Sequence, residues 1–209
     1  MRRFSCPSCQ AEVFFTNTDC LTCNTQLVYA PGQGFAPSTD GTIACANRAV
    51  IGCNWAAEGE GGLCLSCQHT SLLPDLSVAG QTEAWAKIEA AKRSVIRALC
   101  HLGLPLRDAE GRPAPRFEFK ADPLDRFAPR VLTGHADGVI TLNIAEADDS
   151  TREAARAAMG EPYRTLAGHL RHEVAHHYEN ILTEGHPDRL AALRQVFGEE
   201  RQDYREALQ

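Results

Sequence analysis

The 209-residue sequence has no long apolar segment, and no run approaches the roughly 18 residues that a membrane-spanning helix needs. No apolar stretch follows Arg2 and Arg3, so we predict no secretory signal peptide. We therefore expect a cytoplasmic protein with no membrane span. Apolar residues make up 44% of the chain and charged residues 23%, which is the composition of a globular protein rather than a disordered one.

Basic side chains are scarce in the first third of the chain. The stretch up to residue 70 has only three arginines against five carboxylates, Glu12, Asp19, Asp40, Glu58 and Glu60, and the whole chain has a formal charge of −6. A nucleic-acid-binding module needs a basic stripe to neutralise phosphates. The sequence therefore argues against a nucleic-acid partner.

Cysteine is nearly absent after residue 67, but the stretch before it contains eight of the nine cysteines. Four of them form two C-x-x-C pairs with ten residues between the pairs: Cys6, Cys9, Cys20 and Cys23. Each pair places two thiolates on one tight turn, and two such turns complete a tetrahedron around Zn²⁺. A redox dithiol would instead need one pair at the start of a helix. We predict a first structural zinc site here.

The remaining four cysteines of this stretch have a looser spacing, with seven residues between the first two: Cys45, Cys53, Cys64 and Cys67. We predict that they form a second structural zinc site, although His69 could replace one thiolate. Protein ligands fill all four positions of such a site, so zinc there supplies folding energy and not catalysis. Cys100 lies beside an apolar stripe and is interpreted as a core residue.

Composition divides the chain near residue 75. We predict an α+β protein with a double zinc ribbon over residues 1–75 and a larger α+β domain over residues 76–209, joined by a linker at 71–81. Helices are expected at 82–103, 148–160, 162–185, 187–197 and 199–208, and strands at 11–15, at 116–121 and on both sides of "GHADG" (134–138). In the first of these helices Thr82 is the expected N-cap and Gly103 the stop, with Trp85, Ile88, Val95 and Leu99 on one apolar stripe.

The stretch "RHEVAHHYEN" (171–180) contains His-Glu-x-x-His inside a predicted helix. A rotation of about 100° per residue puts His172 and His176 about 40° apart on one face, so both imidazoles can reach one metal ion. Glu173 lies on the flank, where it can act as general base toward a water molecule that the metal activates. The spacing therefore predicts a catalytic zinc site of a peptidase.

A catalytic zinc usually has three protein ligands, and the third is not fixed by the spacing. His169 is a candidate for a group that orients a residue of the metal site or faces the substrate, and His177 is expected to be a packing or surface residue. The candidates for the third ligand follow the helix: His186, Glu199, Glu200 and Asp203.

Several stretches taken together carry a family likeness: "CPSC…FFTNTDCLTC", "CANRAVIGCNW", "LCLSC", "IEAAKRSVIRALCHLGLPL", "VLTGHADGVITLNIAEADD", "MGEPYRTLAGHLRHEVAHHY" and "FGEERQDYREAL". The chain resembles bacterial zinc-binding metallopeptidases with an N-terminal zinc-ribbon region. The resemblance implies an HExxH zincin in which "GVITLNI" (138–144) is the edge strand that pairs with an extended peptide. Members of this family look longer, which implies a truncated chain whose third zinc ligand, a glutamate, follows Gln209.

Two functions are compatible with these patterns. The first is a zinc-dependent peptidase that acts on a peptide or protein substrate, with two structural zinc ions and one catalytic zinc ion. The second is a non-enzymatic protein in which the ribbons bind a protein partner and an incomplete zincin domain serves as a scaffold. An intact Glu173 favours the first, and the missing third ligand favours the second.

Overall fold

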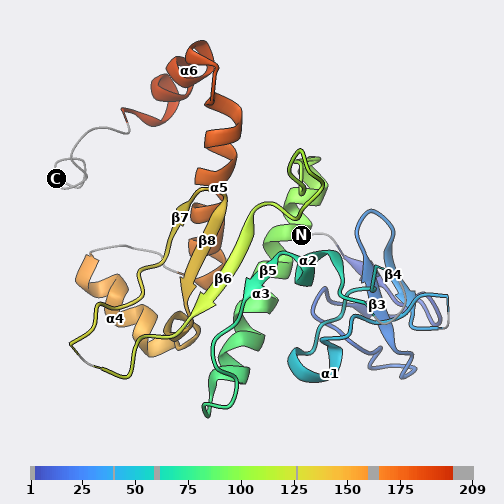
Figure 1. Cartoon of the computed structure of the whole chain (residues 1–209). Coiled ribbons are helices and arrows are strands. Elements are labelled where there is room, and N and C mark those ends of the chain that lie inside the picture. Colours follow the sequence, from blue (N-terminus) through green and yellow to red (C-terminus); the bar gives the residue numbers. More distant parts are fainter. Residues whose placement is uncertain (1–2, 40, 59–61, 126, 160–164, 200–209) are drawn as a thin grey trace.

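We describe the protein from a computed structural model, which places residues 3–39, 41–58, 62–125, 127–159 and 165–199 (Figure 1). It is a mixed α+β structure, as predicted. A small β region with two four-cysteine groups is followed by helices and a four-stranded sheet. No described helix has both the length and the apolar composition needed to cross a membrane.

The first part of the chain is held together by aromatic rings and two short antiparallel ribbons. Strand β1 (Phe4–Ser5) pairs with β2 (Glu12–Val13), and β3 (Leu27–Ala30) pairs with β4 (Gly34–Pro37). The strand expected at 11–15 is therefore only two residues long. Ring contacts with centroids 5.0–6.5 Å apart join five residues, namely Phe4, Phe15, Tyr29, Phe35 and Trp55. Such contacts support a segment whose strands are too short to form a core alone.

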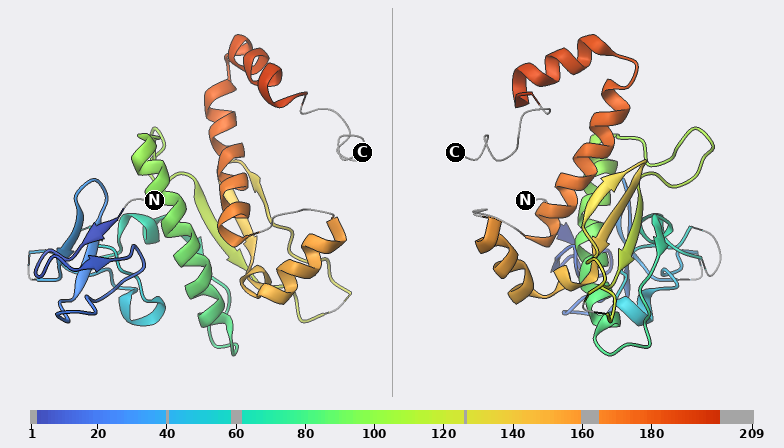
Figure 2. Two further views of the ribbon diagram at one scale, coloured as in Figure 1. Left: turned by 180° about the vertical axis from the view of Figure 1, so that it is seen from behind. Right: turned by 60° about the vertical axis from the view of Figure 1, so that its left-hand side comes forward.

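Helix α3 (Gln81–Leu102) lies between this region and the sheet (Figure 2). It contacts α1 (Arg48–Ile51) and α2 (Leu65–Gln68) of the cysteine region, and also α5 (Leu166–Thr183). The predicted apolar stripe is confirmed: Trp85, Ile88, Val95 and Leu99 are all buried. Gly103 ends the helix in the left-handed conformation, as expected, whereas the N-cap is Gly80 and not Thr82.

The sheet has the order β5-β6-β8-β7 and begins in the segment that was predicted to be a linker. Strand β5 (Thr70–Leu72) pairs in parallel with β6 (Arg116–Lys120), and β6 pairs in parallel with β8 (Val139–Asn143). Residues 71 and 72 of the expected linker are thus part of the sheet. Helices α3 and α5 both pack on one face of the sheet (Figures 1 and 2).

The expected edge strand at 138–144 is wrong in its position. Strand β8 lies inside the sheet, and β7 (Gly134–Ala136) forms the edge, antiparallel to β8. The cause is a tight turn at Asp137 and Gly138, which have φ values of 49° and 73°. Positive φ at both central residues is the signature of a type I′ hairpin turn, which folds β7 back onto β8.

The C-terminal part is helical. The 3₁₀-helix η1 (Ile144–Ala147) leads into α4 (Asp149–Met159), and α5 is followed by α6 (Pro187–Phe197). Helix α5 begins after the N-cap Thr165, whose hydroxyl accepts a hydrogen bond from the Gly168 amide. The expected start at Pro162 and the expected helix at 199–208 fall largely outside the described residues.

One core joins the second cysteine group to the sheet. It contains all four cysteines of that group, the apolar stripe of α3, the inner faces of β6 and β8, and residues of α5. The first cysteine group has its own small cluster, with Val13 and Leu27. The second group is therefore built into the core of the larger domain.

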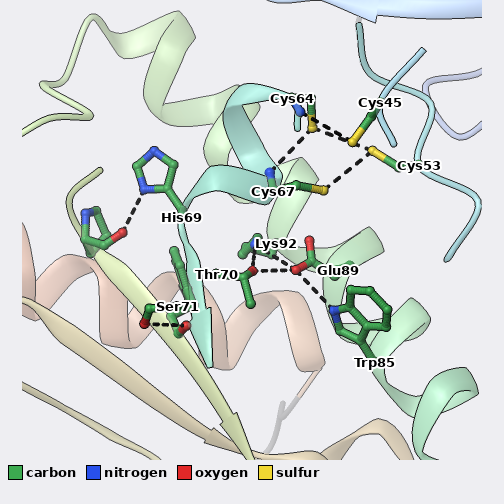
Figure 3. Close-up of polar contacts among 12 residues, drawn as sticks. Cys45, Cys53, Cys64, Cys67, His69, Thr70, Ser71, Trp85, Glu89 and Lys92 are labelled. Atoms are coloured by element: carbon green, nitrogen blue, oxygen red, sulfur yellow. Dashed lines mark hydrogen bonds and ion pairs between the residues drawn. The ribbon is translucent and has the colours of Figure 1, made fainter. Parts of the chain in front are cut away.

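A buried ion pair lies at the centre of this shared core (Figure 3). Lys92 Nζ donates to Glu89 Oε1 at 2.8 Å, and both side chains are fully buried. The same carboxylate oxygen accepts from the Thr70 hydroxyl on β5, at 2.6 Å. The ammonium group also lies over the rings of Phe117 and Phe119, at 5.4 and 5.6 Å from their centroids. These contacts fix α3 against the start of the sheet.

Candidate functional site

The first cysteine group has the geometry of a tetrahedral zinc site. The Sγ atoms of Cys6 and Cys23 are 3.7 Å apart, and those of Cys9 and Cys20 are 3.6 Å apart. Thiolates at about 2.3 Å from one zinc ion would be about 3.8 Å from each other. The Thr25 hydroxyl lies 3.1 Å from Cys23 Sγ, and its hydrogen bond lowers the pKa of this thiol to about 6. That favours the thiolate form that zinc binds.

The second cysteine group is buried and equally compact. Cys53 Sγ lies 3.6 Å from Cys64 Sγ and 3.9 Å from Cys67 Sγ (Figure 3). The backbone amide of Cys64 donates to Cys45 Sγ at 3.3 Å, and such N–H donors stabilise thiolates. His69 does not replace a thiolate, because the compact group consists of the four cysteines without it; its Nδ1 bonds the Pro115 carbonyl oxygen at 2.7 Å. The two groups fit zinc, and both have all four ligand positions filled by protein.

Two histidines of α5 converge one helical turn apart. His172 Nε2 and His176 Nε2 are 3.1 Å apart, and their rings are perpendicular with centroids at 4.7 Å. Two imidazoles on one tetrahedral zinc ion, each at about 2.0–2.1 Å, would have their nitrogens about 3.3 Å apart. His176 is exposed, with 48% of its side-chain surface accessible, so a ligand can approach from solvent.

Glu173 is buried beside these histidines and is held by His169. His169 Nε2 lies 3.2 Å from Glu173 Oε1, and His169 Nδ1 lies 2.6 Å from Glu146 Oε2. Burial alone would raise the pKa of Glu173, but His169 and the nearby His172 hold it below its usual value. The Glu173 carboxylate is therefore ionised and oriented near neutral pH, as a general base must be.

Glu146 was not among the residues that the sequence pointed to. It lies on η1, which follows β8 directly, and it accepts a hydrogen bond from Thr133 at 2.5 Å in addition to its contact with His169. A carboxylate just after a central strand is a weak signal in sequence. The contact joins residues 23 positions apart and depends on how β8 and α5 pack.

His177 is buried and not on the surface, so it is a packing residue. Its ring makes a perpendicular contact with His135 of β7, with centroids 5.6 Å apart, and its exposed surface is 7%. Burial lowers the pKa of His177 and of His135, and the nearby His176 lowers the pKa of His135 further. His135 was also missed by the sequence analysis, since "GHADG" was interpreted only as a turn.

The free edge of the sheet lies next to α5 (Figure 1). A two-residue type I′ turn makes Ala136 and Val139 the hydrogen-bonded pair that flanks it. His135, opposite Ile140, then occupies a non-hydrogen-bonded position, where the backbone N–H and C=O point away from the partner strand. In the part of the chain that the structure describes, no strand pairs with this outer edge.

The described residues do not supply a third ligand for His172 and His176. Among them, only the two cysteine groups bring three or more metal-ligating side chains together. His186 stands at the N-cap position of α6 without a side-chain capping hydrogen bond, and Glu199 pairs with Arg194 at 3.3 Å. Glu200 and Asp203 lie outside the described residues.

Comparison with known proteins defines the class of the chain. Residues 3–78 match a zinc-ribbon domain, in agreement with the two four-cysteine groups. Residues 81–209 match the family described as "Putative zinc-binding metallo-peptidase". The second match covers more than half of the chain, and the protein belongs to this zinc-binding family.

Relatives of the chain occur in mycobacteria. Uncharacterized proteins of Mycobacterium tuberculosis and Mycobacterium bovis are 40% identical to it over 215 residues, an alignment that covers 100% of this chain and 62% of each relative. The chain thus spans less than two thirds of the length of these relatives. No solved structure matches it.

Proposed function

We propose that the protein is a zinc-dependent peptidase whose active site lies on α5. One observation supports this most directly: His172 and His176 bring their Nε2 atoms to 3.1 Å, next to a buried carboxylate held by a hydrogen bond. Two imidazoles and one oriented glutamate on a single helix are the groups that metal-assisted peptide hydrolysis needs. Membership of the zinc-binding family supports the same assignment.

In this proposal each side chain has a separate task. Zinc held by His172 and His176 would polarise the scissile carbonyl and lower the pKa of a water molecule. Glu173 accepts a proton from the water while the water oxygen attacks the carbonyl carbon. It then delivers that proton to the amine nitrogen as the C–N bond breaks. His169 orients Glu173, and Glu146 in turn fixes His169.

The substrate would bind as an extra strand. The outer N–H and C=O of His135 on β7 face away from β8, and they offer an extended peptide one pair of main-chain hydrogen bonds. β7 contacts α5, so a peptide on this edge would pass close to His176. We therefore assign the role of substrate edge to β7 in place of residues 138–144.

The catalytic metal can be counted. With both cysteine groups and the helix site loaded, the full chain should contain about three zinc ions, and the double variant His172→Ala, His176→Ala about two. Three ions would mean that a third ligand comes from outside the described residues, where Glu200 and Asp203 lie. Two ions in both proteins would mean that His172 and His176 do not retain zinc in this chain.

The test of the mechanism is the variant Glu173→Gln, assayed on an unfolded protein substrate. We expect cleavage to be abolished while zinc content and thermal unfolding stay as in the wild type. Glu83→Gln, at an exposed site in the first turn of α3, is the matched control and should cleave normally. Persistent cleavage by Glu173→Gln at the wild-type rate would rule out this base.

A second candidate function is a non-enzymatic scaffold in which the ribbons bind a protein partner. The absence of a third ligand for His172 and His176 among the described residues favours it. It predicts two zinc ions per chain and no difference between wild type and Glu173→Gln in any cleavage assay.

A further inference from the structure

A cavity of about 490 Å³ lies between the β7–β8 turn and the C-terminal half of α5. Its walls come from His135, Asp137 and Gly138 on the hairpin and from His177, Asn180 and Glu184 on the helix side. Neither the metallopeptidase mechanism nor the zinc sites use this cavity. It adjoins the strand edge that we assign to the substrate, and it is large enough for one long side chain.

The polar groups of the cavity favour a cation. Asp137 and Glu184 contribute two carboxylates, and Asn180 adds an amide. Among the described residues that line it there is no lysine or arginine to neutralise these charges. An uncompensated pair of carboxylates next to an amide attracts an ammonium or guanidinium group.

Two buried imidazoles provide an independent indication of a ligand. In the described structure the Nε2 atoms of His135 and His177 are both buried and lack a hydrogen-bond partner. Only 7% of the surface of His177 is exposed, and the residue lines the cavity wall. Buried polar atoms in folded proteins almost always have a partner, so groups left without one at a cavity point to a ligand or water that completes them.

The remaining lining suits the shape of a basic side chain. Ile181 supplies apolar surface at the rim and is 45% exposed. Lysine and arginine carry methylene stems that pack on such surfaces while the charged head reaches polar groups. A cavity with an apolar rim and carboxylate walls therefore matches both parts of these side chains.

The position of the cavity relates it to the scissile bond. Asn180 and Glu184 follow His176 by 4 and 8 residues on or just after α5, which corresponds to about 6 to 12 Å along a helix axis. An extended peptide advances about 3.4 Å per residue. A side chain in the cavity would thus belong to a residue about two to four positions from the scissile bond.

We propose that this cavity is a specificity subsite for a lysine or arginine of the substrate, an inference that rests on the proposed peptidase function. Asp137 and Glu184 bind the charged head, and β7 binds the adjoining backbone. The double variant Asp137→Asn, Glu184→Gln removes both charges with little change in shape. The control Glu83→Gln, Glu153→Gln makes the same change of net charge on α3 and α4.

The first experiment is a cleavage-site profile of the full, zinc-loaded chain on a peptide library, read by mass spectrometry. We expect basic residues to be enriched about two to four positions from the cleaved bond. The enrichment should fall about fivefold in the double variant, because two exposed ion pairs contribute about that factor. The control variant should keep the preference. Cleavage without a basic preference, or an equal preference in the double variant, overturns the subsite and leaves the peptidase proposal intact.

The second experiment does not depend on catalysis. Nα-acetyl-arginine amide is titrated into the full chain while the histidine ring signals are followed by NMR, with the neutral isostere Nα-acetyl-citrulline amide as the comparison. We expect the arginine compound alone to shift the signals of His135 and His177, and the double variant to lose the shifts. Shifts in a chain that cleaves nothing would retain the cavity and reject the peptidase. Equal behaviour of the two compounds, or no shift with either, overturns the subsite.

Discussion

The two cysteine groups should differ sharply in what their loss does to the chain. Cys64 is fully buried and belongs to the core that includes α3, the sheet and α5. Cys9 is exposed, and its group forms a small cluster with Val13 and Leu27, which Phe4 and Phe35 connect to the larger core. We therefore predict that Cys64→Ser unfolds the metallopeptidase region, whereas Cys9→Ser leaves it folded.

The magnitude follows from the energy of a structural zinc ion. Zinc bound to four protein ligands contributes about 10–16 kcal/mol of apparent folding energy at neutral pH, and a whole domain is stable by only about 5–15 kcal/mol. Loss of the second zinc ion should therefore lower the free energy of unfolding by about as much as the whole domain is stable. Loss of the first should cost a similar amount, but that cost falls on residues that share little surface with α5.

Hydrogen exchange read by mass spectrometry, with zinc counted in the same samples, separates the two variants. Each should contain one zinc ion fewer than the wild type. Amides of α3 and α5 should lose protection in Cys64→Ser and keep it in Cys9→Ser. Wild-type protection of α3 and α5 in a Cys64→Ser protein that has lost its zinc would refute the view that the second group belongs to the larger core.

Three further predictions concern the residues around the site. Lys92→Ala leaves the buried Glu89 carboxylate without its cation, and urea unfolding should show that the free energy of unfolding falls by about 3–5 kcal/mol. The double variant Lys92→Met, Glu89→Leu should lose less, and an equal loss would contradict this account. His169→Phe should lower kcat for peptide cleavage about tenfold with unchanged zinc content, because Glu173 loses its hydrogen-bond donor; a loss of zinc instead would give His169 a different role. Gly138→Val should destabilise the chain more than Gly111→Val. Both glycines have positive φ, at 73° and 79°, but only at Gly138 does an added Cβ already lie in van der Waals contact with His177, at 3.7 Å, so that the two further methyl groups of valine have the ring beside them. Thermal unfolding of the two variants side by side decides this.

Local patterns in the sequence predicted helix α3 and the two cysteine groups. The apolar stripe of α3 and the stop at Gly103 depend on residues within a few turns of one another, and both were confirmed. Spacing likewise predicted that the eight cysteines would gather into two groups of four. In each case the signal lies within the segment that adopts the structure.

Contacts between distant segments were not predictable in this way. Strand β5 is three residues long and has no alternating pattern, so only its pairing with β6 makes it a strand. The sequence pattern predicted a turn over 134–138. The turn is in fact confined to Asp137 and Gly138, so Gly134–Ala136 is free to form the edge strand. The contacts of His169 with Glu146 and of His177 with His135 arise from packing across the domain.

The place of β5 in the sheet has a consequence for how the two halves of the chain cooperate. The second cysteine group ends at Cys67 and strand β5 begins at Thr70, so only two residues separate a cysteine of the group from a paired strand. A flexible tether would let a bound partner sample a wide volume, and its local concentration near the helix site would fall with tether length. Here the two-residue connection leaves the cysteine region almost one orientation relative to the sheet. If the cysteine region binds a partner, that partner would be held at a fixed distance from α5.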